Sequence, residues 1–112
     1  MKTLRLTLAA ATMALLPATP AMADVSAELA ATCAACHGEG GSKPVAPNYP
    51  ILAGQYADYL AHALREYRSG KRKNPIMAGQ AANLSDEEIK ALSRYFEAQE
   101  SPLYTPSIPG AN

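Results

Sequence analysis

The chain has 112 residues, with ten Lys and Arg, ten Asp and Glu, and two cysteines, which corresponds to one small domain. Its formal net charge of zero becomes −2 if residues 1–23 are removed, because Lys2 and Arg5 are then lost. That balance argues against nucleic acid as a partner, since nucleic-acid-binding proteins carry a basic surface. A domain this small buries only a modest core, so a large apolar ligand inside it would add much of the buried surface.

The N-terminal segment has the pattern of a secretory signal peptide that is cleaved after Ala23. Lys2 and Arg5 form its positive start, an apolar run follows over residues 6–16, and small residues precede the cleavage point. The apolar run is too short to cross a bilayer, which takes about 20 residues, and an uncleaved membrane anchor is the alternative. We therefore expect an exported protein of 89 residues that begins at Asp24.

Two cysteines and a histidine stand together at residues 33–37, in the order Cys-Ala-Ala-Cys-His. On a helix, Cys33 and Cys36 share a face, and His37 lies one turn after Cys33. The C-x-x-C-H pattern is the attachment signature of c-type haem, in which two sulfurs bond the ring and the imidazole binds the iron. We therefore expect one covalent haem c, attached through Cys33 and Cys36, with His37 as an iron ligand.

Other uses of the two thiols fit the sequence less well. A disulfide between exported cysteines is common, but a Cys-x-x-Cys disulfide closes a very short loop and stabilises a fold little. A dithiol oxidoreductase would require a βαβ pattern, which is not visible. A zinc site would require further ligands, and outside the pentad only His62 offers another imidazole. These alternatives stay open, but haem attachment explains the histidine as well as the cysteines.

The rest of the chain predicts helices joined by loops, without the alternating pattern typical of strands. Asp24 or Ser26 can cap the first helix, and Gly38 can end it in a left-handed conformation. The last helix has the strongest start signal, because Ser85 and Glu88 form a capping box. We expect helices over residues 24–37, about 55–69 and 85 to about 99, loops over 39–50 and 71–83, and a proline-rich tail over 101–112.

What fills the second axial position of a haem iron decides between electron transfer, gas binding and catalysis. Met77 is the one methionine that remains after removal of residues 1–23, and it lies in the expected loop 71–83. We expect its thioether to bind the iron, the alternative being that Met77 fills a gap in the core. His62 is the rival ligand, but it lies off the apolar face of its helix and is expected to face solvent. That face consists of Tyr56, Leu60, Ala63, Leu64 and Tyr67.

The pentad, the late methionine and the capped last helix together resemble class I c-type cytochromes. The likeness is closest to the small monohaem bacterial periplasmic type and to one half of the dihaem periplasmic ones. It covers nearly all of residues 24–99, through stretches at 33–38, 50–55, 68–77 and 84–96. The resemblance implies an all-α fold in residues 24–100, with three main helices and loops wrapped around one covalently attached haem.

The resemblance also implies roles for single residues. His37 would be the proximal iron ligand and Met77 the distal one, and the Pro50 carbonyl would accept the second ring proton of the histidine. The haem would contact Leu52, Leu60 and Leu64. The first and last helices would cross near Leu29 and Tyr95, where the family often has a glycine that this chain lacks.

We expect a periplasmic one-electron carrier rather than an enzyme, because filled axial positions keep substrates from the iron. Redox proteins that dock transiently would be its partners, and the carrier itself would be a monomer. One alternative is a cytochrome subunit bound permanently to a dehydrogenase, such as a flavoprotein; another is a ligand-binding or peroxidase-like protein with a displaceable Met77. The basic residues could form a solvated helix end, a docking patch or partners for the haem propionates. They are Arg65, Arg68, Lys71, Arg72 and Lys73.

Overall fold

A computed structural model describes the backbone of residues 21–103 and the side chains of residues 27–103. Most of the expected signal peptide, and residues 104–112 of the expected tail, lie outside these ranges. The cleavage site and the domain boundaries therefore stay predictions. None of the helices in residues 21–103 combines the length and the apolar character that a membrane crossing requires.

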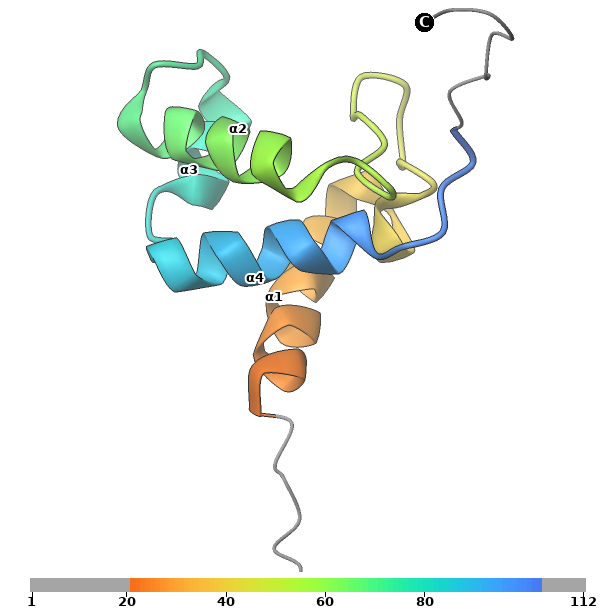
Figure 1. The fold of residues 1–112 in the computed structure, drawn as a ribbon. Coiled ribbons are helices and arrows are strands. Elements are labelled where there is room, and N and C mark those ends of the chain that lie inside the picture. The colour runs from red at the N-terminus through yellow and green to blue at the C-terminus, as the bar shows by residue number, and fades with distance from the viewer. Residues whose placement is uncertain (1–20, 104–112) are drawn as a thin grey trace, which may run out of the picture.

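The described chain consists of helices and loops, and residues 21–103 contain no strand (Figure 1). The all-α prediction is therefore confirmed. Two elements, η1 and α3, lie in segments that were predicted to be loops. The elements in order are α1 (Ala21–His37), the 3-10 helix η1 (Glu39–Gly41), α2 (Ala57–Ser69), α3 (Pro75–Ala81) and α4 (Asp86–Glu97).

Helix α3 is the main departure from the predicted arrangement, since residues 71–83 were expected to form a loop. The Asn74 side chain accepts hydrogen bonds from the backbone N–H groups of Ile76 and Met77, which caps the helix, and Pro75 occupies its first turn. Asn74 is extended, with φ −162° and ψ 111°, as is usual for a residue before proline and as an N-cap requires. Met77 therefore lies in the first turn of a helix.

Helix α1 differs from its predicted form at its C-terminal end. In the described chain it reaches back to Ala21, and alanines on both sides of the expected cleavage point favour helix; a cap at Asp24 or Ser26 stays a prediction for the chain that begins at Asp24. Gly38 ends it with φ 79° and ψ 167°, a glycine-only conformation rather than the left-handed helical one. An added Cβ at Gly38 would lie 2.0 Å from the carbonyl oxygen of Lys43, so this turn requires glycine.

Helices α2 and α4 lie close to their predicted positions. The predicted capping box of α4 is present, because Ser85 accepts from the Glu88 N–H and Glu88 accepts from the Ser85 N–H. Gly70 ends α2 in the left-handed conformation, with φ 77° and ψ 6°. Tyr56 precedes α2 and is 73% exposed, so its placement on the apolar face of this helix was wrong.

The core lies where α1, α2 and α4 meet. In Figure 1, α4 crosses α1, and α2 runs alongside α4. One small residue, Ala30 of α1, is buried at the crossing with α4, and Leu29 and Tyr95 pack beside it, as predicted for that crossing. Because the separation of two helices depends on the side chains between them, Ala30 allows close approach without glycine. The buried cluster consists of Ala30, Leu60, Leu92 and Phe96.

Helix α2 is joined to α4 at both of its ends. At its start, the backbone N–H of Ala57 donates to Oε1 of Glu97 over 2.9 Å. Near its end, the Arg68 guanidinium donates to the carbonyl oxygen of Leu84 and to Oδ1 of Asp86, each over 2.7 Å. These ties hold α2 and α4 in a fixed relation, and together the two helices supply part of the wall of an internal cavity.

Candidate haem-binding site

A cavity of about 280 Å³ lies between all four α-helices and the segment that follows η1. Its wall brings together residues from distant parts of the chain, and many of them are apolar. All eight predicted site residues line it: Cys33, Cys36, His37, Pro50, Leu52, Leu60, Leu64 and Met77.

The His37 imidazole is buried, with 6% of the residue exposed, and it is held in one orientation. Its Nδ1 lies 2.8 Å from the carbonyl oxygen of Pro50. Because a carbonyl oxygen only accepts, Nδ1 carries the proton, which leaves the lone pair of Nε2 free in the neutral ring. A histidine fixed in this way is arranged as metal-bound histidines usually are.

The two cysteines lie on α1, half-buried at the cavity wall, and no disulfide joins them. The Sγ of Cys33 lies 3.6 Å from the carbonyl oxygen of Leu29. The pKa of Cys33 is raised, first because burial disfavours the thiolate and in part because Cys36 is close. Reactive redox cysteines have a lowered pKa, so this environment argues against a dithiol oxidoreductase.

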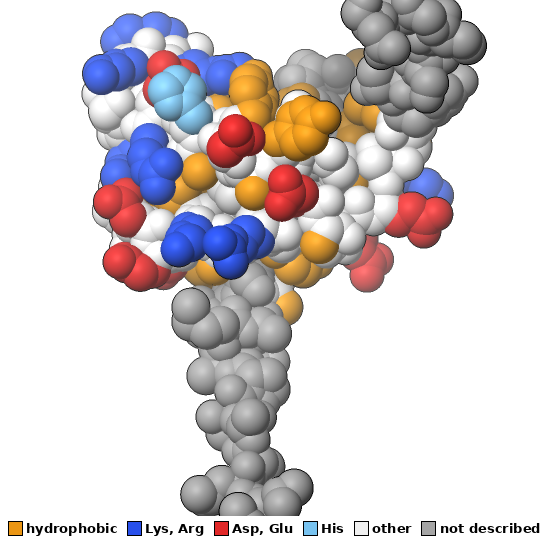
Figure 2. Space-filling view, viewed as in Figure 1, with side chains coloured by type: hydrophobic (Ala, Val, Ile, Leu, Met, Phe, Trp, Pro, Cys, Tyr) orange, Lys and Arg blue, Asp and Glu red, His pale blue; other side chains and the backbone are white. Residues whose placement is uncertain are grey.

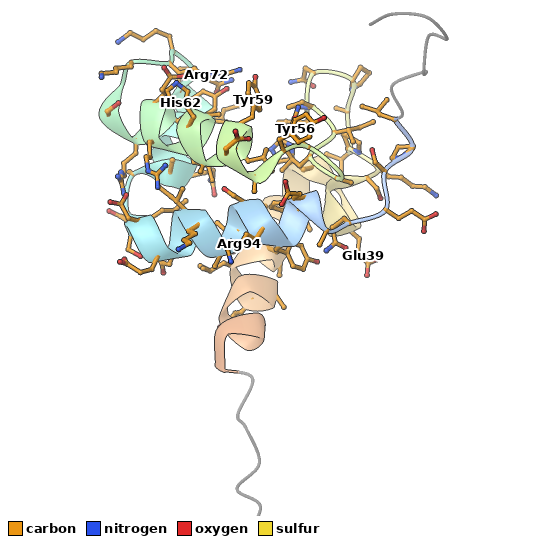
Figure 3. All side chains as sticks on the ribbon, viewed as in Figure 1. Glu39, Tyr56, Tyr59, His62, Arg72 and Arg94 are labelled. Atoms are coloured by element: carbon orange, nitrogen blue, oxygen red, sulfur yellow. The ribbon has the colours of Figure 1, made fainter. Side chains whose placement is uncertain are left out.

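The histidine that competed for the role of second ligand lies away from the cavity. The His62 side chain is 72% exposed, and its Nε2 lies 3.3 Å from Oε1 of Glu66 on the same helix. Figure 3 shows His62 on the outer side of α2, as the sequence predicted. Within the described residues, no three His, Cys, Asp or Glu side chains are grouped so that they could hold a metal ion, so a zinc site has no support there.

Met77 lines the cavity from α3, an element other than the one that carries His37. Its side chain is half-buried, whereas the neighbouring Ile76 is 52% exposed. Leu60 and Leu64 of α2 complete the adjacent wall. A soft thioether and an imidazole with a free nitrogen therefore line one apolar cavity, which suits a bound tetrapyrrole with iron.

The basic residues near the end of α2 have different surroundings. Arg68 and Arg65 both approach Oδ1 of Asp86, at 2.7 Å and 3.6 Å. The pKa of Asp86 is lowered, chiefly because its carboxylate accepts a hydrogen bond from Arg68. Figure 2 shows Lys and Arg side chains gathered around this end of the molecule, with acidic side chains among them. Two of the five positive charges are therefore already paired.

Arg72 lines the cavity together with Tyr59 and Tyr67; the sequence left Arg72 as one of several possible partners for the haem propionates and gave Tyr59 no role. The Arg72 guanidinium lies 3.4 Å from the Tyr59 hydroxyl and 5.2 Å from the centre of the Tyr67 ring. Figure 3 shows Arg72 beside Tyr59. The spacing of Tyr59, Ala63 and Tyr67 at intervals of four residues was the signal that could have placed Tyr59 on the cavity side of α2.

The family model for cytochrome c matches residues 23–99. The chain belongs to the cytochrome c family. Members of this family carry haem c attached through cysteines, and haem c is the cofactor of this chain. The prediction of a class I c-type cytochrome with an all-α fold is confirmed.

Two relatives and one solved structure show the extent of the similarity. Cytochrome c-554(548) of Halomonas halodenitrificans is 44% identical over 72 residues, which are 62% of this chain and 86% of that protein. The thiosulfate dehydrogenase electron acceptor of Thiomonas intermedia is 44% identical over 94 residues, 83% of this chain and 43% of that one. Reduced recombinant cytochrome c4 from Pseudomonas stutzeri has the same fold, with a TM-score of 0.63 and 34% identity over 74% of this chain and 50% of the other. The chain thus spans half or less of the length of the last two proteins.

Proposed function

We propose that this protein is a periplasmic one-electron carrier whose haem iron is bound by His37 and Met77. The supporting observation is that one cavity is lined by His37, already fixed by Pro50, and by Met77 from a different helix. Cys33 and Cys36 line the same cavity from α1, where thioether bonds would hold the ring. When bound, haem c supplies reversible one-electron exchange at its iron.

The side chains around the cavity would favour the reduced state. The Met77 thioether is a soft ligand and stabilises ferrous iron, so histidine–methionine ligation gives a higher potential than ligation by two histidines. Leu52, Leu60 and Leu64 would shield the bound haem from water, and a low dielectric disfavours the additional charge of the ferric state. The hydrogen bond from His37 to the Pro50 carbonyl makes the imidazole a more basic ligand.

If the chain supplies both axial ligands of the haem iron, the protein transfers electrons but does not catalyse a reaction at the iron. His37 and Met77 would then leave no position at the iron for a substrate. The remaining chemistry is electron exchange with a protein that docks at the surface, and such contacts are small and steered by charge.

A visible spectrum of the protein, exported together with a haem-attachment system, tests the ligand assignment. Haem that resists acid–acetone extraction would be covalent, and Cys33→Ala with Cys36→Ala should release it. The weak ferric iron–thioether band at the red end of the spectrum should be present in the wild type and lost in Met77→Ala. His62→Ala is the matched control and should keep the band; its loss there, or its absence from the wild type, would contradict methionine ligation.

Export is supported by the charged, apolar and small-residue pattern of residues 1–23. We expect the protein recovered from the periplasm to begin at Asp24. Intact mass spectrometry with one attached haem checks this start. A mass that includes residues 1–23 would show that the segment is retained as an anchor.

A second candidate is a cytochrome that accepts electrons as the partner or permanent subunit of a dehydrogenase. It is favoured by the name of the Thiomonas intermedia relative, an electron acceptor of thiosulfate dehydrogenase. Size-exclusion chromatography of the protein from its native host separates the two candidates. Co-elution with a second chain in constant proportion would favour a subunit, whereas a clean monomer would favour a free carrier.

A further inference from the structure

The segment from Gly70 to Leu84 leaves α2 and returns to α4, and it carries Met77 on α3 (Figure 1). Arg68 lies just before this segment and bridges to its far end. Its Nη1 donates to the carbonyl oxygen of Leu84 over 2.7 Å, and its Nη2 donates to Oδ1 of Asp86 over 2.7 Å. One guanidinium therefore closes the base of the segment that carries the proposed distal ligand.

The bond from Arg68 to the Leu84 carbonyl is the stronger part of this closure. Asp86 is 64% exposed, so water and salt screen its attraction for the guanidinium. The Arg68 side chain is 30% exposed, and its bond to Leu84 is partly buried. The planar fork of arginine serves both acceptors at once, whereas a lysine ammonium is a point charge on a flexible stem.

Near its start the segment is tied to α2, because Arg72 donates to the Tyr59 hydroxyl and lies over the Tyr67 ring, but residues 74–80, which carry Met77, include no fully buried residue. Ala81 is the one residue of α3 that is fully buried, and Ile76 is exposed. The Asn74 cap orders the first turn of α3, but it does not connect the segment to α2 or α4. Regions with few buried apolar contacts open locally at low free energy. We therefore expect the hydrogen bonds of Arg68 to contribute much of the free energy that keeps segment 70–84 packed against the cavity.

We propose that Arg68 is a positioning residue for Met77. By joining the two ends of segment 70–84, it keeps the Met77 thioether at the cavity and limits the fraction of molecules in which this side chain has moved away. Arg68 does not line the cavity, so it acts through the backbone and not by contact with the cofactor. The proposal rests on the proposed function, because it takes Met77 to be the distal ligand.

Titration of the ferric holoprotein with imidazole measures this opening, since imidazole binds the iron once Met77 has left. The apparent affinity is proportional to the open fraction. In Arg68→Ala we expect imidazole to bind about tenfold more tightly than in the wild type, which corresponds to about 1.4 kcal/mol. Arg68→Lys, which retains the charge but not the fork, should give an intermediate increase.

Glu97→Ala is the matched control. It removes the tie at the other end of α2, where Glu97 accepts from the Ala57 N–H over 2.9 Å, far along the helix from the segment that carries Met77. Its imidazole affinity should stay within about twofold of the wild type, a change small compared with the expected tenfold. Unfolding in urea, measured on each variant, reports the loss of global stability separately. Equal increases in Arg68→Ala and Glu97→Ala, or no increase in Arg68→Ala, would overturn the proposal.

Met77→Ala distinguishes failure of this proposal from failure of the proposed function. If that variant keeps the iron–thioether band, methionine ligation is wrong and the positioning role falls with it. If the band is lost in Met77→Ala but Arg68→Ala binds imidazole as the wild type does, the ligand assignment stands and only the role of Arg68 is refuted.

Discussion

Replacing Gly41 by alanine should destabilise the folded protein by about 3 kcal/mol. Gly41 is buried and has φ 70°, a conformation that costs an L-residue about 1 kcal/mol or more. An added Cβ would lie 2.8 Å from Cβ of Leu52, closer than real Cβ contacts, and 3.0 Å from Cδ1 of Phe96, tighter than most of them. Overpacking of this kind typically costs about 1–3 kcal/mol, and the two effects together give the estimate.

Gly70→Ala is the control that separates backbone strain from crowding. Gly70 has φ 77°, but nothing lies within 4 Å of an added Cβ, so only the backbone cost of about 1 kcal/mol applies. Urea unfolding of both holoproteins, followed by circular dichroism, gives the two free energies of unfolding. If Gly41→Ala loses no more stability than Gly70→Ala, the crowding between Gly41, Leu52 and Phe96 has been misjudged. Because Leu52 and Phe96 also line the cavity, the haem spectrum of Gly41→Ala should shift as well.

Two further predictions concern the start of α4. Ser85→Ala should lower the free energy of unfolding by about 1 kcal/mol, because the Glu88 N–H loses its cap, and Ser85→Thr should lose less in the same urea assay. Asp86→Asn should be less stable than the wild type at pH 7. Arg68 lowers the pKa of Asp86 below its ordinary value of 3.8, so this carboxylate contributes stability above that value and loses it as the pH falls through the lowered pKa. A stability difference between Asp86→Asn and the wild type that is unchanged in acid would contradict this account.

The parts of the fold that the sequence predicted correctly depend on neighbours in the chain. The capping box at Ser85 and Glu88 spans three residues, and it placed the start of α4. The pentad at residues 33–37 concentrates both thiols and the imidazole, so haem attachment needed no knowledge of the fold. Signals of this kind act within one turn of helix and survive any tertiary arrangement.

The errors arose where one local signal has two outcomes. Residues 71–83 were predicted to be a loop, but Asn74 and Pro75 within them begin α3, because the Asn74 side chain caps it. Gly38 was expected to adopt the left-handed helical conformation, but the approach of the Lys43 carbonyl selects another glycine-only region. In both cases contacts with nearby residues, and not the conformational preference of the residue itself, determined the backbone conformation.

Contacts between distant residues were not accessible from the sequence. The sequence showed that Arg68 and Arg72 are basic and near a helix end, and several uses remained open. The structure pairs Arg68 with Asp86, 18 residues later, and places Arg72 over Tyr59. Such pairings depend on how α2 and α4 pack, which periodicity alone does not specify.

The position of α4 at the end of the domain has a consequence for assembly. Every predicted site residue precedes residue 78, yet the core that joins α1 to α2 is completed by Leu92 and Phe96 of α4. A chain emerging from a ribosome or an export channel therefore presents the attachment cysteines long before the cavity can close. A fragment ending at Asn83 would carry all the groups that hold the cofactor but not the helix that brings them together. The protein could thus be reassembled from two fragments, residues 24–83 and 84–103. Recovery of the haem spectrum would report that the fragments have associated.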